Sequence, residues 1–339
     1  MPDTNEPATA PTALLVMEEE RRADVYPPAV LAEIGRLVQW QGPPLTRQEL
    51  DADPDVLRTV DLLLTGWGAP VLDDALLSHA PRLRAVLVAA GSVRHLTTPA
   101  FWERGIPIVS AAAANAVPVA EFTLAHVLLG LKQAHHIARE VTRSRRFPTD
   151  PDVPGAYRSR VGLVGLGHIG RLVAAHLARF DVEVLAADPV ASADTARRAG
   201  VRLVSIEELF ATCHVVSLHA PLLPETRGSI GARLLNSMGP GTTLINTARG
   251  ALIDETAATQ VLRARPDLTA VLDVTHPEPP AHDSPLFTLP NVVLTPHLAG
   301  ALGAERHRLG QLVLDELRRL AQNQPLQHAI DPARAASLA

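Results

Sequence analysis

The sequence predicts an α/β protein with two doubly wound parallel-sheet domains, and three observations lead to that prediction. Short apolar runs alternate with helical patterns along most of the chain, as in β–α–β units. Residues 161–188 combine an apolar run, a glycine-rich turn, a helical pattern and a second apolar run. The length of 339 residues suits about two ordinary domains.

The first hundred or so residues are expected to form a domain of their own. Residues 1–12 are polar and rich in Pro and Ala, which predicts a disordered tail. The following patterns predict strands at 13–17, 61–64, 84–89 and 106–109, and helices at 29–40, 71–79 and 101–104. Their alternation predicts a small parallel sheet with helices on its faces.

The middle of the chain predicts one long helix followed by a connection. Residues 117–141 carry apolar side chains at helical spacing, which indicates an interdomain connector or, less favoured, part of a dimer interface. Residues 143–160 are Pro-rich and basic. A solvated linker explains this composition better than a phosphate-binding patch does.

The glycine-rich stretch has the spacing of a dinucleotide site. Gly165, Gly167 and Gly170 follow the pattern G-x-G-x-x-G between an apolar run and a helical one. Such glycines permit a tight turn, close approach of a pyrophosphate and close packing of helix on strand. Asp188 lies 23 residues after Gly165, where an acid can bind an adenosine ribose and would repel a 2′-phosphate. The stretch therefore predicts NAD binding, with NAD favoured over NADP.

Beyond this stretch the β–α alternation continues, and polar residues repeatedly follow the predicted strands. Strands are expected at 214–218, 244–246, 270–272 and 292–295, with a final helix at 309–321. Asp254 is a suitable N-cap for the helix that follows it. Ligands of open parallel sheets bind outside the carboxyl ends of the strands, so a site is expected at that edge.

Three side chains at these strand ends form a candidate reactive set: Arg249, Glu278 and His297. Histidine can exchange the hydroxyl proton while hydride moves, because its ordinary pKa lies near neutrality. A carboxylate beside it stabilises the imidazolium and fixes the tautomer. An arginine can hold a substrate carboxylate through two charge-assisted hydrogen bonds. Each residue taken alone is more readily explained as an ordinary loop side chain.

Composition narrows the classes of partner. The net charge of −5 and the pI near 6.3 argue against nucleic acid or an anionic membrane as the main partner. The single cysteine, Cys213, suits a reducing cytoplasm, and the N-terminus lacks the features of a signal peptide. No apolar run reaches the length of a membrane span, and no metal site is predicted. We therefore expect a cytoplasmic protein.

Several segments together resemble the D-isomer-specific 2-hydroxyacid dehydrogenase family. They are VGLVGLGHIGR (161–171), HVVSLHAPLLPET (214–226), LINTARGALIDE (244–255), LDVTHPEPP (272–280) and VVLTPHLAG (292–300). The resemblance runs in order from about residue 85 to 300, and a concatenation of this length is far more specific than any one motif.

The resemblance implies a role for each matching residue. Arg249 would bind the substrate carboxylate, His297 would be the acid/base, and Glu278 would pair with it. Cofactor contacts are implied at His168, Ile169, Asp188, Pro221, Thr226, Thr247 and Asp273, beside the three glycines. The backbone at Gly91, Ser92 and Val93 would contact the substrate. The reaction would interconvert a D-2-hydroxy acid and its 2-keto acid.

The resemblance also implies a domain plan. A Rossmann NAD-binding domain, residues 115–302, is inserted into a flavodoxin-like substrate domain formed by residues 13–114 and 303–339. A homodimer across the long helix is expected as well. Two alternatives remain: an NAD(H)-sensing, corepressor-like binding protein, and a formate dehydrogenase-like enzyme, against which Glu278 counts. The loop AAGSVRHL (89–96) departs from the family's glycine, hydrophobic, Asp-Asn-type run and leaves the substrate's side chain open.

Overall fold

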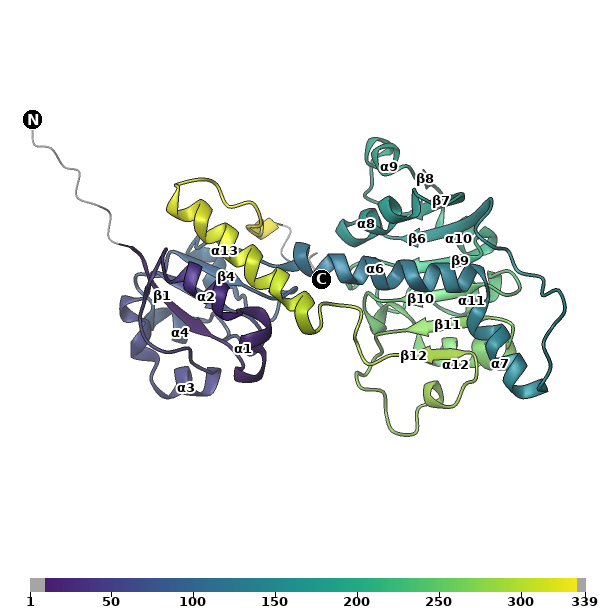
Figure 1. Ribbon diagram of the computed structural model, residues 1–339, viewed down its shortest axis with the longest axis horizontal. Helices are drawn as coiled ribbons and strands as arrows, with labels where there is room; N and C mark the ends of the chain where they lie inside the picture. Colours follow the sequence, from purple (N-terminus) through teal and green to yellow (C-terminus); the bar gives the residue numbers. More distant parts are fainter. Residues whose placement is uncertain (1–9, 334–339) are drawn as a thin grey trace, which may run out of the picture. The chain divides into compact units, whose positions relative to one another are not determined.

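The computed structural model describes residues 10–333, which form two compact units (Figure 1). Unit 1 takes the chain up to Asn115 and again from Ala301, and unit 2 takes Ala116–Gly300. The prediction of two α/β parallel-sheet domains, one inserted into the other, is confirmed. The expected tail falls mostly outside the described residues, and its last residue, Thr12, already belongs to the first strand.

Unit 1 contains a five-stranded parallel sheet. Its strands lie in the order β2-β1-β3-β4-β5, with bounds Thr12–Val16 (β1), Gln39–Trp40 (β2), Leu62–Thr65 (β3), Ala85–Val88 (β4) and Ile108–Ser110 (β5). Its helices are Glu19–Val25 (α1), Pro28–Ile34 (α2), Arg47–Ala52 (α3), Asp74–His79 (α4), Pro99–Glu103 (α5) and His307–Ala321 (α13).

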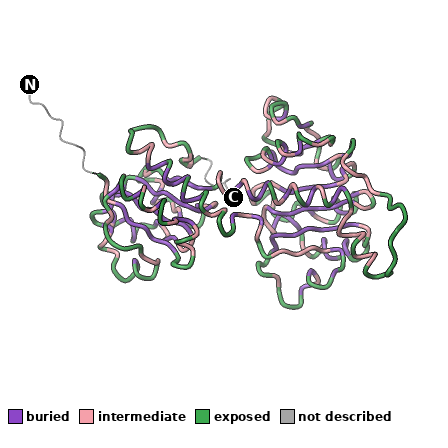
Figure 2. Tube along the Cα trace, viewed as in Figure 1, coloured by how far each residue is buried: buried purple, intermediate pink, exposed green. Residues whose placement is uncertain are grey.

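Alternation along these strands supplies a core on each face of the sheet. Leu15, Leu64 and Leu87 pack with residues of α1, α2 and α13, whereas Leu63 and Val86 pack with residues of α3, α4 and α5. Successive side chains of a strand point to opposite faces, so a strand covered on both sides is apolar throughout. Figure 2 shows the strands as the buried centre of the unit.

Unit 2 contains a seven-stranded parallel sheet in the order β12-β11-β10-β9-β6-β7-β8. The bounds are Ser159–Val164 (β6), Val182–Ala187 (β7), Arg202–Leu203 (β8), Val215–Leu218 (β9), Thr243–Asn246 (β10), Thr269–Leu272 (β11) and Val292–Leu294 (β12). The strand order reverses between β6 and β9, which is the switch point where doubly wound sheets bind their ligands.

Helices cover both faces of this sheet as well. One core receives residues of Ala112–Leu131 (α6), His168–Leu177 (α8) and Ala193–Ala199 (α9). The other receives residues of Ile206–Thr212 (α10), Ala232–Ser237 (α11) and Glu255–Ala264 (α12). Asp254 caps α12 as predicted, because its carboxylate accepts the backbone N–H of Ala257 at 3.0 Å.

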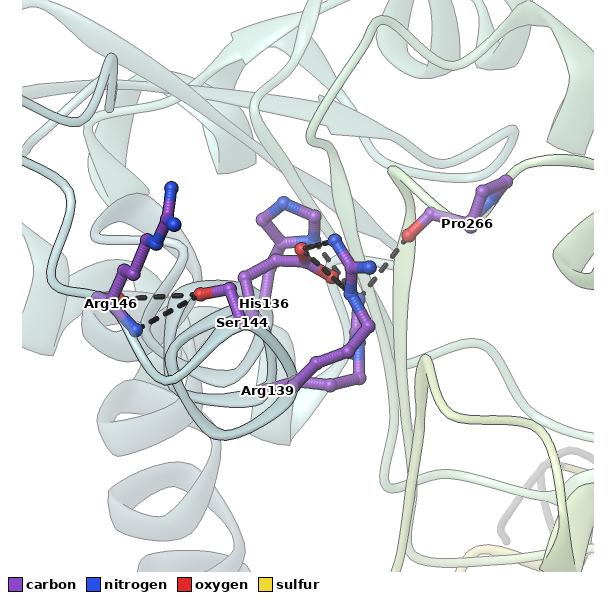
Figure 3. Close-up of polar contacts among 7 residues, drawn as sticks. His136, Arg139, Ser144, Arg146 and Pro266 are labelled. Atoms are coloured by element: carbon purple, nitrogen blue, oxygen red, sulfur yellow. Dashed lines mark hydrogen bonds and ion pairs between the residues drawn. The ribbon is translucent and has the colours of Figure 1, made fainter.

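The prediction of one helix over 117–141 is wrong, because the chain breaks after α6 and starts again as Ala134–Ser144 (α7). Gln133 adopts a left-handed conformation, φ 47°, at the break. Arg139 anchors α7 by donating hydrogen bonds to the carbonyls of Pro290 (2.8 Å) and Pro266 (3.3 Å). Its guanidinium also contacts His136 of the same helix (Figure 3).

Two further expectations need correction. The helix expected at 29–40 ends at Ile34, and Gln39–Trp40 forms the edge strand β2 instead. Among the described residues, α6 is by length and composition long and apolar enough to cross a membrane, contrary to the expectation that no apolar run has the length of a span. A helix buried in a protein core can be as long and apolar as a membrane span. Val127 and Leu131 of α6 belong to a core of unit 2.

Candidate active site

The glycine turn between β6 and α8 has the shape that its spacing predicts. Gly165 has φ +98°, and a Cβ there would lie 2.8 Å from the backbone of His219 and Ala220. A Cβ on Gly170 would lie 2.3 Å from the carbonyl oxygen of Gly165. Gly167, in contrast, has no heavy atom within 4 Å of that position, so its backbone is open to a ligand.

The first turn of α8 complements this opening. Gly167 is the N-cap and, as a glycine, supplies no side-chain cap to the helix terminus. Free N–H groups at a helix N-terminus favour a phosphate. His168 and Ile169 are the first two residues of α8, which places their backbone at this end. The turn, the open Gly167 and the start of α8 fit a dinucleotide pyrophosphate.

Asp188 follows β7 and ties its loop to the glycine turn. Its Oδ2 accepts the N–H of Leu166 at 2.7 Å, and Oδ1 accepts those of Val190 (2.9 Å) and Ala191 (3.1 Å). The carboxylate therefore lies beside the turn, on the neighbouring strand, as a ribose-binding acid must. Residues 189–192 (PVAS) contain no cation that could pair with a 2′-phosphate.

Three more residues expected to contact a cofactor use their polar groups within the protein. The hydroxyl of Thr226 donates to the carbonyl of Pro221 at 2.6 Å and accepts the N–H of Leu223 at 2.8 Å, which closes the loop after β9. The hydroxyl of Thr247, at the end of β10, lies 3.2 Å from that of Thr123 on α6. These contacts rigidify the loops around the switch point.

The three candidate reactive residues follow three adjacent parallel strands. Arg249 comes after β10, Glu278 after β11 and His297 after β12, and these strands pair in register. Their carboxyl ends therefore meet at one edge of the sheet. A Cβ on Gly250 would lie 2.0 Å from the backbone of Thr275, which shows how closely the loop of Arg249 approaches the loop that leads to Glu278.

His297 and Glu278 are in direct contact. Nδ1 of His297 lies 2.5 Å from Oε1 of Glu278, and the two side chains are 52% and 42% exposed. A protonated Nδ1 donates to the carboxylate in this geometry, which leaves Nε2 for another partner. The pair has the arrangement of an oriented acid/base with an accessible ring.

Asp273 holds the loop that carries His297. Its side chain is buried, and it accepts hydrogen bonds from the Thr295 hydroxyl (2.6 Å) and from the N–H groups of Leu298 and Ala299 (both 2.9 Å). Its carbonyl oxygen also accepts the N–H of His297 at 2.9 Å. The resemblance implies a cofactor contact for Asp273, and its carboxylate is engaged here by residues of the loop after β12.

Arg249 is positioned by the residues on either side of it. Asn246, fully buried at the end of β10, donates from its amide to the Arg249 carbonyl at 2.9 Å and accepts the N–H of Ala248 at 3.1 Å. The guanidinium itself donates to the Ala248 carbonyl at 2.6 Å, and the residue is half-buried. A guanidinium carries five N–H donors, so one side chain can make a structural contact and bind an anion as well.

The expected substrate loop lies in unit 1, directly after β4. Gly91 and Ser92 are half-buried, and the side chain of Val93 belongs to a core of the unit. The hydroxyl of Ser110 donates to the carbonyls of Ala90 and Gly91 at 3.1 and 2.5 Å. Since Val93 points inward, only its backbone is available to a ligand.

Sequence reasoning missed several residues of this region. Thr123, Asn246 and the loop-holding function of Asp273 depend on contacts across the fold that no local pattern records. The sequence does not distinguish His219 from the other histidines either. Burial lowers the pKa of His219 to about 4, and its Nε2 is buried with no hydrogen-bond partner among the described residues. This ring is therefore neutral at physiological pH and unsuited to donate a proton as an imidazolium.

Comparisons with a family model and with curated relatives point to the same family. A family model described as "D-isomer specific 2-hydroxyacid dehydrogenase, NAD binding domain" matches residues 124–299. The chain is 35% identical over 301 residues to D-3-phosphoglycerate dehydrogenase of Mycobacterium tuberculosis, covering 87% of this chain and 55% of the relative. It is 33% identical over 253 residues to (S)-sulfolactate dehydrogenase of Chromohalobacter salexigens, covering 73% and 81%. The chain thus spans about half the length of the phosphoglycerate dehydrogenases it matches.

Solved structures agree. The TT0316 protein of Thermus thermophilus superposes with a TM-score of 0.72 at 27% identity, covering 94% of this chain and all of that one. The D-isomer specific 2-hydroxyacid dehydrogenase of Lactobacillus delbrueckii ssp. bulgaricus, in its NAD complex, gives 0.75 at 20% identity, covering 94% and 100%. At that identity the second likeness concerns the fold alone.

Proposed function

Because the chain belongs to the D-isomer specific 2-hydroxyacid dehydrogenase family, a family of NAD-dependent oxidoreductases, we propose that it interconverts a D-2-hydroxy acid and its 2-keto acid. The observation that carries this proposal is the His297–Glu278 pair at the same sheet edge as Arg249. A turnover assay with single-residue variants tests the activity directly.

Each residue has a distinct task in the proposed reduction. Bound NADH supplies the hydride that reaches C2 of the keto acid. The Arg249 guanidinium binds the substrate carboxylate through charge-assisted hydrogen bonds. His297 donates its Nε2 proton to the carbonyl oxygen as the alkoxide forms. Glu278 accepts from Nδ1, so it orients the ring and stabilises the imidazolium before the proton is given up.

The proposed cofactor is NAD rather than NADP, held by Gly165, Gly167 and Gly170 with the start of α8. Asp188 supports this preference, because a 2′-phosphate beside its carboxylate would be repelled and residues 189–192 offer no compensating cation. The loops of Pro221, Thr226, Thr247 and Asp273 would enclose the cofactor. We expect a higher kcat/KM for NADH than for NADPH. An equal or higher value for NADPH would contradict the assignment.

The central test is a turnover assay with the purified chain. NADH oxidation is followed by absorbance with glyoxylate, hydroxypyruvate, pyruvate, phenylpyruvate and 2-ketoisocaproate. We expect His297→Ala to reduce kcat by about 10²–10⁴-fold, the usual contribution of a general acid–base. NADH binding, measured by fluorescence, should persist. Arg249→Ala should raise KM strongly.

The matched control is His282→Ala, which removes an exposed histidine of the same unit. It should retain wild-type turnover. Near-normal turnover by His297→Ala would remove His297 from the mechanism. Tight NADH binding without turnover of any keto acid would favour an NAD(H)-sensing protein instead.

We also propose a cytoplasmic homodimer that binds neither nucleic acid nor membrane. The reduced, buried Cys213 and the net charge of −5 support these assignments. The second protomer is expected on the α6–α7 region, where α7 buries none of its residues fully. Light scattering tests the dimer, and a monomeric mass at micromolar concentration would contradict it.

A further inference from the structure

The chain that follows α13 returns to the edge of the five-stranded sheet (Figure 1). Residues 327–330, which we call the strap, lie antiparallel to β5. The N–H of Ile330 donates to the carbonyl of Ile108 at 2.8 Å, and the N–H of Ser110 donates to that of His328 at 3.3 Å. An edge strand leaves a row of backbone groups unpaired, and the strap pairs two of those groups on β5.

A buried carboxylate of α13 holds the strap in place. Glu316 is 1% exposed, and its Oε1 accepts the N–H groups of Gln327 and His328, both at 3.1 Å. Its Oε2 lies 3.0 Å from the same nitrogen of Gln327. A carboxylate is tolerated in a protein interior when hydrogen bonds pair it, so the strap and Glu316 stabilise each other. Leu326 and Ile330 flank this contact and pack against the cores on opposite faces of the sheet.

The strap contacts the residue of β5 that holds the loop after β4. The hydroxyl of Ser110 donates to the carbonyls of Ala90 and Gly91, and its backbone N–H donates to the carbonyl of His328. A chain of contacts therefore runs from Glu316 through the strap and Ser110 to the loop. All of these residues belong to unit 1. The same loop carries the backbone that is expected to contact the substrate.

We propose that Glu316 is a positioning residue, which fixes the loop after β4 through the strap and Ser110 and thereby lowers KM for the keto acid. This inference rests on the proposed function and on the substrate contact expected of residues 91–93. Release of the strap would leave the Ser110 N–H without its partner and loosen the loop that the Ser110 hydroxyl holds. Hydride and proton transfer are assigned to NADH and His297, so the effect should fall on KM and not on kcat.

The first test removes the carboxylate. Glu316→Met keeps a long side chain but leaves the two N–H groups of the strap unpaired. We expect amides of residues 327–330 and 91–97 to exchange hydrogen about tenfold faster. We also expect KM for the keto acid that the wild type reduces fastest to rise about tenfold, at unchanged kcat and NADH affinity.

Two further variants of α13 calibrate this result. Glu316→Gln keeps one oxygen in the place of Oε1, which accepts both N–H groups, so it should restore most of the wild-type KM. Asp315→Asn is the matched control, because Asp315 is an exposed acid on the same helix that pairs with Arg318. It should leave both the exchange and KM unchanged.

A second route releases the strap without altering α13, in case Glu316→Met fails to fold. Ile330→Pro removes the N–H that donates to Ile108 and should raise KM in the same way. Ser110→Ala removes the hydroxyl that holds the loop. If Glu316 acts through Ser110, the double variant Glu316→Met, Ser110→Ala should raise KM no more than the stronger single variant does. Effects that multiply would overturn the proposed route.

Failure of the inference is distinguishable from failure of the proposed function. Faster exchange in the strap with unchanged exchange in residues 91–97 and unchanged KM would overturn the inference and leave the dehydrogenase intact. Normal exchange of the strap in Glu316→Met would overturn it as well. If no keto acid is turned over, the proposed function fails and exchange alone decides. Parallel acceleration of both segments in Glu316→Met and in Ile330→Pro supports the positioning of the loop, and acceleration confined to the strap overturns it.

Discussion

The backbone of His297 has an unusual conformation that its neighbours enforce. Its φ of 52° lies in the left-handed region, which costs a non-glycine residue roughly 1–3 kcal/mol. The N–H of His297 donates to the carbonyls of Asp273 and Thr295, and the Asp273 carboxylate holds the residues on both sides of it. The hydrogen bonds of Asp273 thus hold the loop in the conformation in which the His297 ring contacts Glu278.

Asp273→Asn should therefore impair the candidate site without touching it. An amide has one acceptor oxygen and one donor NH₂, so it cannot accept from the Thr295 hydroxyl and from the N–H groups of Leu298 and Ala299 together. We expect kcat to fall by about tenfold or more and the amides of residues 295–299 to exchange hydrogen faster, since a buried donor left unpaired costs about 1–3 kcal/mol.

The matched control is Asp267→Asn, an acid of the same unit whose lowered pKa reflects its pair with Arg265 near the surface. A pair of this kind contributes little, so kcat should be unchanged. If Asp273→Asn retained both normal kcat and normal exchange in residues 295–299, the carboxylate would not be what holds the loop.

At the junction of α6 and α7, two histidine rings pack against each other. The centroids of His126 and His135 are 5.7 Å apart, and the Phe122 ring lies 4.5 Å from that of His126 on the same helix. Nδ1 of His126 and Nε2 of His135 are buried without hydrogen-bond partners among the described residues. Burial, followed by the charge of the other ring, lowers the pKa of His126, against a smaller opposing effect of Asp273. The pKa of His135 is lowered mainly by burial and to a smaller extent by the positive charge of Arg139.

These shifts predict an acid-sensitive junction. Each histidine has a lower pKa folded than unfolded, so the unfolded state binds more protons once the pH falls below about 6.5. The stability that these two neutral histidines contribute is therefore fully present above that pH. It decreases as the pH falls towards their lowered pKa values in the folded state. We expect amides of α7 to lose protection from hydrogen exchange between pH 7 and pH 5.

The double variant His126→Gln, His135→Gln removes both titrating groups, and its α7 should show a flatter pH dependence. His176→Gln, a half-buried histidine on α8 away from this junction, serves as the control and should keep the wild-type slope. A wild-type slope in the double variant would assign the pH dependence of α7 to other groups.

Elements whose cause is local were predictable from the sequence, and those fixed by packing were not. The second apolar run of residues 161–188 forms the strand Val182–Ala187, and the glycine turn lies where the glycine spacing predicts it, because both patterns are local to the sequence. The break at Gln133 and the strand β2 could not be predicted, since a left-handed residue and the pairing of an edge strand depend on residues that are neighbours only in the folded chain. Helical periodicity continues across Gln133 in the sequence although the helix does not.

The candidate site divides in the same way. Arg249, Glu278 and His297 could be grouped beforehand because parallel strands share their carboxyl edge, and the structure shows Glu278 and His297 in contact. The contacts of Asp273 with the loop after β12 and the Thr123–Thr247 contact could not be predicted, since they join residues whose proximity only the folded chain creates. Strand order predicts which loops meet, but it does not predict which side chains are already occupied.

At the scale of the whole molecule, each hydrophobic core formed by residues 10–333 belongs to a single unit. Both cores of unit 1 draw only on residues of that unit, including Leu309, Val313 and Leu317 from the returning α13. Both cores of unit 2 lie within Ala116–Gly300. Each unit thus has the apolar burial needed for its own cooperative transition.

The close packing of α13 on α1 allows this independence to be tested. A Cβ on Gly310 would lie 2.0 Å from the carbonyl oxygen of Val25 and 3.2 Å from the Tyr26 ring. Gly310→Ala should therefore push the helices apart and destabilise unit 1 by about 1–3 kcal/mol, despite the better helix propensity of alanine.

Calorimetry should show the consequence as a shift of one transition only. The melting temperature of unit 1 should fall by about 2–4 °C for each kcal/mol, the value typical of domains of this size. The transition that NADH raises, assigned to unit 2, should stay in place. Gly42→Ala is the control, because no heavy atom lies within 4 Å of its Cβ position and both transitions should be unchanged. A joint shift of both transitions in Gly310→Ala would mean that the two cores unfold as one.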